Sequence, residues 1–187
     1  MKKQFSTYKP FLVFLGTFFI CYLSLTFLYQ TYLNQYDAGR NEVDGFTKIV
    51  ASQSVFFMKF FNTNSFEQPN LEDASVKLFY KNTYLSRVVE GCNALSVMIL
   101  FISFVLAFAG KFKPTLLFLI AGTGIIHFFN VLRIAILNVL IFNYPNQKHL
   151  LHGVVFPLII YGIVFVLWII WVNNFSSYAK KTISKQG

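Results

Sequence analysis

A cysteine, an arginine and a histidine in this sequence form a combination that can carry out acyl transfer. Cys92 lies within the polar stretch 90–93, unusual surroundings for a cysteine that only fills space. Arg133 lies inside a long apolar stretch, and His152 lies at the start of the next one. A thiolate can attack a carbonyl, an imidazole can act as general acid and base, and a guanidinium can stabilise the oxyanion that forms. The residue types therefore indicate nucleophilic catalysis by a cysteine.

Three further polar residues are candidates for supporting roles. Asn130 precedes Arg133 by three positions, so both lie on nearly the same helix face, where Asn130 can hold the guanidinium or contact a substrate. Glu90 can orient an imidazole, and Asn93 completes the polar surroundings of Cys92. A charge within an apolar stretch is costly, which makes Arg133 a functional candidate, although snorkelling toward the outer headgroups also explains its position.

The identity of the catalytic histidine is open among His127, His149 and His152. His127 lies deeper in its apolar stretch and is expected to be a hydrogen-bonded interior residue, whereas His149 lies three positions before His152. Metal binding by these histidines and Cys92 is the other interpretation, but they lack the short ligand spacing of metal sites. We therefore predict no metal and no cofactor.

The elements that must position these residues are membrane helices. Of the 187 residues, 56% are hydrophobic and 12% are charged, whereas a soluble domain has about 25% charged residues. A helix that crosses a bilayer needs about 20 apolar residues. Four stretches reach or approach this length: 11–28, 94–109, 116–142 and 154–172. The second is the shortest, and it reaches spanning length only by including the neutral residues from 91 to 110.

The placement of charges predicts how the chain crosses the membrane. The N-terminal tail, the link 110–114 and the C-terminal tail carry lysines and no acid. These lysines are Lys2, Lys3, Lys9, Lys111, Lys113, Lys180, Lys181 and Lys185. All seven acids lie between the first and second apolar stretches. Because basic segments stay in the cytoplasm, four crossings with both termini cytoplasmic are predicted, and the net charge of +9 reflects topology rather than a nucleic-acid surface.

This topology brings the three candidate catalytic residues to the outer surface of the membrane. Arg133 lies about 24 Å along its helix from Leu117, and Cys92 and His152 lie at the outer ends of the neighbouring helices. Only an even number of crossings produces this arrangement. Cys21 lies about midway along the first apolar stretch, so it is too distant in depth to form a disulfide with Cys92.

The sequence thus predicts an all-α, polytopic membrane bundle of about four transmembrane helices, with an extracytoplasmic segment after the first. The predicted divisions are a cytoplasmic tail with the first transmembrane helix at 1–33, the extracytoplasmic segment at 34–90, a three-helix catalytic core at 91–173, and a basic cytoplasmic tail at 174–187.

The segment 34–90 contains three regions of different pattern. Phe46 to Phe61 is apolar with two lysines, which is typical of an interfacial helix or of a short helix packed on the bundle. Asn62 to Asn70 is predicted to be a polar loop. Ser75 to Val89 shows a two-residue alternation around Lys81-Asn82, which predicts either a hairpin or a helical lead-in to the second span.

Three short blocks resemble the signature blocks of the exosortase/archaeosortase family. They are Glu-Gly-Cys-Asn-Ala-Leu at 90–95, Asn-Val-Leu-Arg-Ile at 130–134 and His-Gly-Val-Val-Phe at 152–156. The order of cysteine, arginine and histidine and their positions at helix boundaries are also similar. The resemblance covers roughly residues 85–170, and the short chain with its lysine-flanked first span resembles the XrtF branch.

The resemblance implies a membrane cysteine transpeptidase or protease, that is, a hydrolase-type enzyme of the bacterial cytoplasmic (inner) membrane. Its implied partners are exported proteins that end in a short motif, a transmembrane helix and a basic tail. Carried over by position, Cys92 is the nucleophile, Arg133 the catalytic arginine and His152 the catalytic histidine. Typical members have about eight spans, so the shorter chain is expected to need a partner membrane protein or to accept fewer substrates.

A non-catalytic membrane protein, such as an assembly factor or a small transporter subunit, is the competing interpretation. A transporter requires polar groups near the midplane and interrupted helices, which His127 and Gly122-Thr123-Gly124 suggest only faintly. The placement of the reactive residues near one membrane surface favours the enzyme.

Overall fold

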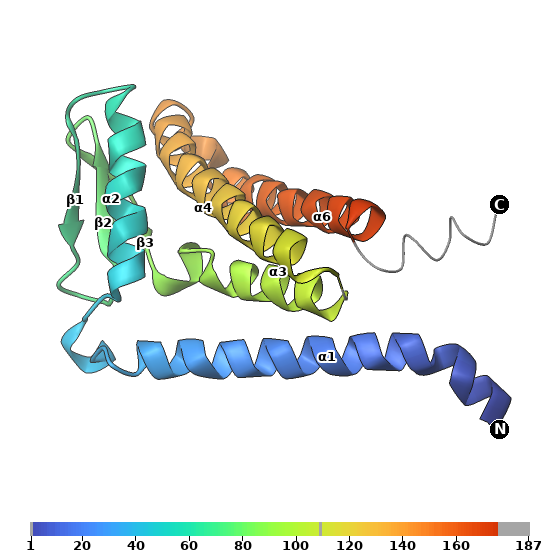
Figure 1. Ribbon diagram of the computed structural model, residues 1–187. Helices are drawn as coiled ribbons and strands as arrows, with labels where there is room; N and C mark the ends of the chain where they lie inside the picture. The colour runs from blue at the N-terminus through green and yellow to red at the C-terminus, as the bar shows by residue number, and fades with distance from the viewer. Residues whose placement is uncertain (1, 109, 176–187) are drawn as a thin grey trace.

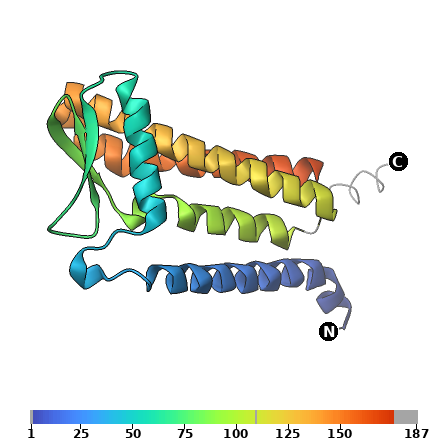
Figure 2. The same ribbon diagram turned by 60° about the vertical axis from the view of Figure 1, so that its left-hand side comes forward.

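The main helices run along the length of the molecule, and a small mixed lobe covers one end of them. The computed structural model describes residues 2–108 and 110–175. The main helices are α1 (Lys2–Leu33), α3 (Leu95–Ala107), α4 (Phe112–Asn143) and α6 (Phe156–Asn174). The start of α1, the α3–α4 link and the end of α6 lie at one end, opposite the lobe (Figures 1 and 2). Successive helices therefore alternate in direction, as the predicted up-and-down bundle requires.

Within the part of the chain that the structure describes, three segments are long and apolar enough to cross a membrane: Tyr8–Leu33, Phe112–Asn143 and Pro145–Asn174. The last begins with the 3₁₀ turn η3 (Pro145–Gln147), the single turn α5 (Lys148–Leu150) and the π-helical turn η4 (Leu151–Val155), which lead into α6. Helix α3 occupies the place of the predicted second span but has only 13 residues, about 20 Å. A bilayer core is about 30 Å thick, so α3 is shorter than a full crossing. The chain is a mostly helical, multi-pass membrane protein, as predicted.

The lobe at the other end combines a helix with a three-stranded antiparallel sheet. After the 3₁₀ turn η1 (Ala38–Arg40) come α2 (Gly45–Lys59), β1 (Ser65–Pro69), β2 (Val76–Tyr80) and β3 (Thr83–Val88), and the strand order is β1-β2-β3. Asp44 caps α2, since its side chain accepts a hydrogen bond of 2.9 Å from the backbone nitrogen of Thr47. This cap explains why the helix begins immediately after the acidic residue.

Of the two alternatives left open around Lys81-Asn82, the structure contains the hairpin, formed by β2 and β3. Both residues have positive φ, at 51° and 60°, which is what a two-residue type I′ turn demands of its central positions. The loop predicted for 62–70 is wrong at its second half, because Ser65–Pro69 forms β1 and pairs with β2. This pairing depends on a neighbouring strand, so the polar stretch itself carried no signal for it.

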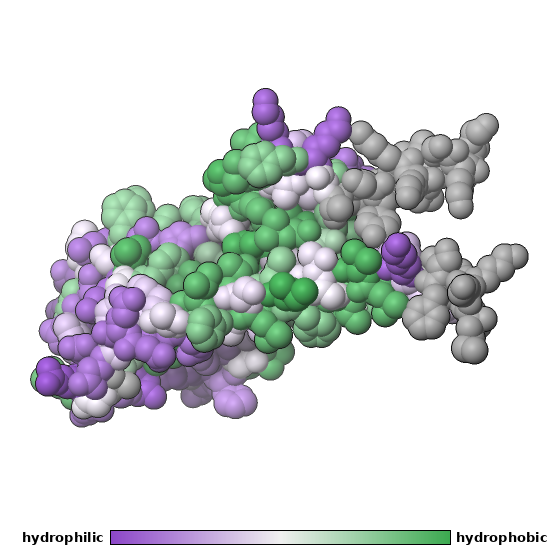
Figure 3. Space-filling model, turned by 60° about the horizontal axis from the view of Figure 1, so that its bottom comes forward, coloured by the Kyte–Doolittle hydropathy of each residue, from purple (hydrophilic) through white to green (hydrophobic). Residues whose placement is uncertain are grey.

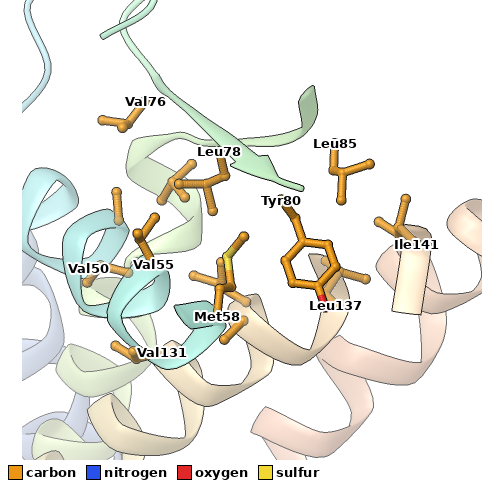
Figure 4. Packing of buried hydrophobic residues seen from close by; sticks show 14 of the residues in the cluster. Val50, Val55, Met58, Val76, Leu78, Tyr80, Leu85, Val131, Leu137 and Ile141 are labelled. Atoms are coloured by element: carbon orange, nitrogen blue, oxygen red, sulfur yellow. The ribbon is translucent and has the colours of Figure 1, made fainter. Parts of the chain in front are cut away.

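The core of the lobe forms where α2 and the sheet pack on the second half of α4 (Figure 4). Val50 and Met58 of α2 and Leu78 of β2 are completely buried. Buried and less buried residues alternate along β2, so that one face of the sheet packs on α2 and α4. The second half of α4 is thereby held in a fixed position against the lobe.

The bundle has a second core, formed by α3, α4 and α6, in which aliphatic side chains surround two buried rings. Phe101 of α3 and Trp171 of α6 are completely buried, and Phe118 of α4 packs beside both. Apolar side chains also cover the outside of the bundle, whereas polar residues gather at the lobe (Figure 3). This distribution is that of a protein whose middle section faces lipid.

Candidate active site

Cys92 lies in a short turn between the sheet and the bundle. The chain leaves β3 and forms the 3₁₀ turn η2 (Glu90–Cys92), where the backbone nitrogen of Cys92 donates 2.9 Å to the carbonyl of Val89. Ala94 then adopts a left-handed conformation with φ 66° before α3 begins. The side chain of Cys92 is half-buried and its thiol is free, as is that of Cys21. The predicted absence of a disulfide between the two is thus confirmed.

Helix α4 places Asn130 and Arg133 beside this turn. Asn130 is buried, and its side-chain nitrogen donates a hydrogen bond of 2.9 Å to the carbonyl oxygen of Cys92. Arg133, three residues on, is half-buried and lies close enough to Cys92 for electrostatic interaction. Among the described residues, Asn130 has no hydrogen bond to the guanidinium, which was one of the two roles expected for it. Instead, Asn130 secures the backbone of Cys92.

A cavity of about 170 Å³ lies beside α4, next to Asn130 and Arg133. It is lined by Gly91, Ala94, Val97, Asn130, Arg133, Pro157, Ile160 and Tyr161. The Nε atom of Arg133 is buried and has no hydrogen-bond partner in the part of the chain that the structure describes. A buried donor of this kind costs free energy unless something accepts from it. The cavity therefore offers a positive, unsatisfied donor next to the Cys92 turn.

His152 approaches the same region from the π-helical turn before α6. Its side chain is exposed and lies close enough to Arg133 and Lys148 for their charges to act on its ring. With His149 it lines a surface pocket of about 480 Å³. Helical turns of the π type are frequent at functional sites, because the extra residue displaces a side chain from its regular position. Arg133 is thus within electrostatic reach of both the thiol and this imidazole, although Arg133 and His152 line different pockets.

His127 lies elsewhere and has a structural environment. Its Nε2 atom is 2.7 Å from Oε1 of Gln53 on α2, and its ring packs against Phe46 at 5.5 Å. The prediction that His127 is a hydrogen-bonded interior residue is confirmed. Across residues 2–108 and 110–175, no group of three or more histidine, cysteine or acidic side chains is arranged to hold a metal ion.

Glu90 and Asn93 flank the cysteine and bind partners that the sequence did not suggest. Tyr29 of α1 donates a hydrogen bond of 2.5 Å to Oε1 of Glu90. The side-chain nitrogen of Asn93 donates to the hydroxyl of Tyr29 at 3.2 Å and to that of Thr47 at 3.1 Å. The carboxylate of Glu90 thus binds a tyrosine rather than an imidazole. Neither Tyr29 nor Tyr161 stands out in the sequence, because each is one of 10 tyrosines.

The arrangement contains the chemical groups needed for acyl transfer by a cysteine. A thiol lies in a turn between the sheet and the bundle, and a guanidinium lies within electrostatic reach of both this thiol and an imidazole. A positive charge favours the thiolate and can also stabilise an oxyanion formed by its attack on a carbonyl. The exposed imidazole is free to exchange protons with a leaving amine or with water.

Comparison with known protein families matches residues 7–174 to the family described as "Transmembrane exosortase (Exosortase_EpsH)". The match covers the bundle, the lobe and all three candidate catalytic residues. No curated protein and no solved structure matches the chain.

Proposed function

This chain belongs to the transmembrane exosortase family, and from this premise we propose that it is a membrane cysteine transpeptidase or protease. Its substrates are exported proteins that end in a sorting signal, made of a short motif, a transmembrane helix and a basic tail. The observation that carries the proposal is the position of Arg133, which interacts electrostatically with both Cys92 and His152. Residues from a loop, from α4 and from the turn before α6 thereby act on one site.

In the proposed reaction the thiolate of Cys92 attacks the carbonyl carbon of the scissile peptide. Arg133 stabilises the resulting oxyanion, since its Nε donor has no partner in the described structure. The carbon–nitrogen bond then breaks, the departing amine takes a proton from the His152 imidazolium, and a thioester remains on Cys92. An acceptor amine or water gives a proton to the neutral imidazole as it attacks the thioester. This step releases the product and restores the thiolate.

We propose that the lobe and the site face the outside of the bacterial inner membrane and that both termini are cytoplasmic. The acids support this orientation, because all seven lie at the lobe end, between the end of α1 and the Cys92 turn. Lys111 precedes α4 and Lys113 lies in its first turn, at the end of this helix that does not pack on the lobe. Lys180, Lys181 and Lys185 are outside the described residues. The basic end belongs in the cytoplasm by the positive-inside rule.

The test is to follow processing of a co-expressed protein with a sorting signal. Cys92→Ala removes the nucleophile, so we expect processing to stop. Cys21→Ala is the matched control, since Cys21 is also free and half-buried but lies on α1 away from the site, and processing is expected to continue. Normal processing by the Cys92→Ala variant would refute the proposed mechanism.

The competing function, a transporter subunit or other non-catalytic component, has less support. Gly122 does not interrupt its helix, because α4 continues unbroken from Phe112 to Asn143. Instead, Gly122 leaves room for the ring of Phe101, which a Cβ atom at this position would meet at 2.3 Å. The glycine is thus explained by helix packing.

A further inference from the structure

The described side chains of helix α1 are exposed or half-buried along its membrane span, with one exception. From Tyr8 to Leu33, where the side chains of α1 are described, Tyr29 is the one buried residue, at 8% exposure. Its neighbours Phe27 and Leu28 are 71% and 62% exposed. A helix that served only as an anchor would have no reason to bury a hydroxyl-bearing ring at this single point. The position of Tyr29 therefore indicates a specific role.

Tyr29 is the centre of a polar network that joins three elements at the Cys92 turn. It donates to Glu90 at 2.5 Å and accepts from Asn93 at 3.2 Å. Asn93 also donates to Thr47 at 3.1 Å, which connects the network to α2. Asn93 and Thr47 are buried, at 1% and 0% exposure. The two hydrogen bonds of the Asn93 side-chain nitrogen are therefore shielded from water, whereas the Tyr29–Glu90 bond is partly buried. Removing a partner of Asn93 leaves a buried group unsatisfied.

The network holds the chain on both sides of the cysteine. Glu90 lies two residues before Cys92, and Asn93 lies directly after it. The side-chain oxygen of Asn93 also accepts from the backbone nitrogen of Leu95 at 2.8 Å, across the left-handed Ala94. A left-handed conformation is unfavourable for alanine and persists only where its surroundings impose it. The turn that presents the thiol is thus maintained by side chains from α1 and α2.

We propose that Tyr29 is a positioning residue that acts on Cys92 through Glu90 and Asn93. This inference rests on the proposed function, because it assigns a role in the presentation of the proposed nucleophile. Helix α1 then contributes to the active site as well as to membrane attachment. Its other end is held independently, by ring contacts of Phe14 with Phe104 and Phe108 at 5.8 Å and 4.4 Å. Loss of the Tyr29 hydroxyl therefore leaves the packing of α1 intact.

The experiment measures the reactivity of Cys92 itself, so it needs no known substrate. In the full chain carrying Cys21→Ala, the rate of modification by a small, membrane-impermeant thiol reagent is measured over a range of pH. Tyr29→Phe loosens the turn, so modification is expected to be faster by about threefold or more and its pH profile to shift. Where a substrate is available, turnover falls about tenfold with little change in KM, as expected when a hydrogen bond to a charged group is lost.

The matched control is Tyr32→Phe, which also removes a hydroxyl from α1. Tyr32 accepts from the backbone nitrogen of Phe46 at 3.3 Å and has no hydrogen bond to the Cys92 turn. Its modification rate and pH profile are expected to match those of the parent. Unchanged melting temperatures of both variants in detergent would show that neither change acts through unfolding.

A double-mutant cycle distinguishes action through Glu90 from a general effect on packing. If Tyr29 acts through the carboxylate, Tyr29→Phe and Glu90→Ala together raise the modification rate no more than the larger single effect. If the rate increases of the two single variants multiply in the double variant, the proposal is overturned. It is also overturned if Tyr29→Phe has the same modification rate and pH profile as the parent. Normal processing by Cys92→Ala would instead refute the proposed enzymatic function. The effect of Tyr29→Phe on the reactivity of Cys92 would still stand.

Discussion

The two cores of this molecule are built differently, although one helix passes through both. In the lobe, consisting of α2, the sheet and the second half of α4, the buried residues are mostly aliphatic, such as Val50, Val55 and Leu78. In the bundle, formed by α3, the first half of α4 and α6, the two large rings of Phe101 and Trp171 are completely buried among aliphatic side chains. The change occurs along α4 between Ile126 and Val131. Asn130 and Arg133 lie at this boundary, beside Cys92.

The difference follows from the two solvents that surround the protein. In the lobe, burial removes apolar surface from water, so the sheet alternates buried and less buried residues. In the bundle, lipid is as apolar as the side chains, so association depends on close packing instead. Exposed apolar residues are accordingly common on α1 and α6. A reactive site at the boundary can receive a substrate from the membrane and an acceptor from water.

The largest effect is expected at the boundary itself. Arg133→Lys keeps a positive charge but loses the planar guanidinium and its buried Nε donor. Processing should fall by about a hundredfold to a thousandfold, which is the range for loss of one oxyanion donor. The measurement is the initial rate of substrate cleavage. A rate within about threefold of the parent would mean that Arg133 supplies charge alone.

The next prediction compares the same substitution in the two surroundings. Leu78 is completely buried in the lobe, whereas Leu117 is 69% exposed on α4. Leu78→Ala should lower the free energy of unfolding by about 2–5 kcal/mol, since it creates a cavity. Leu117→Ala should change it by less than about 0.5 kcal/mol, because a lipid-facing side chain loses little apolar contact that lipid does not replace. Equal losses in reversible denaturation would contradict the distinction between the two cores.

A smaller effect should follow from the close packing of the bundle. Gly122→Ala places a methyl group 2.3 Å from the buried ring of Phe101, and overpacking of this kind costs about 1–3 kcal/mol. The better helix propensity of alanine offsets part of this loss. Gly124→Ala is the control, since a Cβ atom there meets nothing within 4 Å. Thermal unfolding in detergent should therefore show a lower midpoint for Gly122→Ala, whereas the midpoint of Gly124→Ala should not fall.

The sequence by itself determined the broad architecture and the location of the reactive residues. Apolar run length and charge placement depend on local composition, so they predicted the membrane helices and placed Cys92, Arg133 and His152 at one end. The turn at Lys81-Asn82 was also a local signal, because two-residue alternation on either side suggested a hairpin. The three family blocks are likewise continuous in the chain.

Only the tertiary structure decided how the site is held. The partners of the Cys92 turn come from distant parts of the chain: Tyr29–Glu90, Asn93–Thr47 and Asn130–Cys92 are separated by 61, 46 and 38 residues. Strand β1 is similar, since its polar residues form a strand only because β2 lies beside them. Many polar residues along the chain could form a hydrogen bond with a given tyrosine or asparagine. Which of them meet is set by the packing of α1 and α2 around the turn, and no local pattern records that choice.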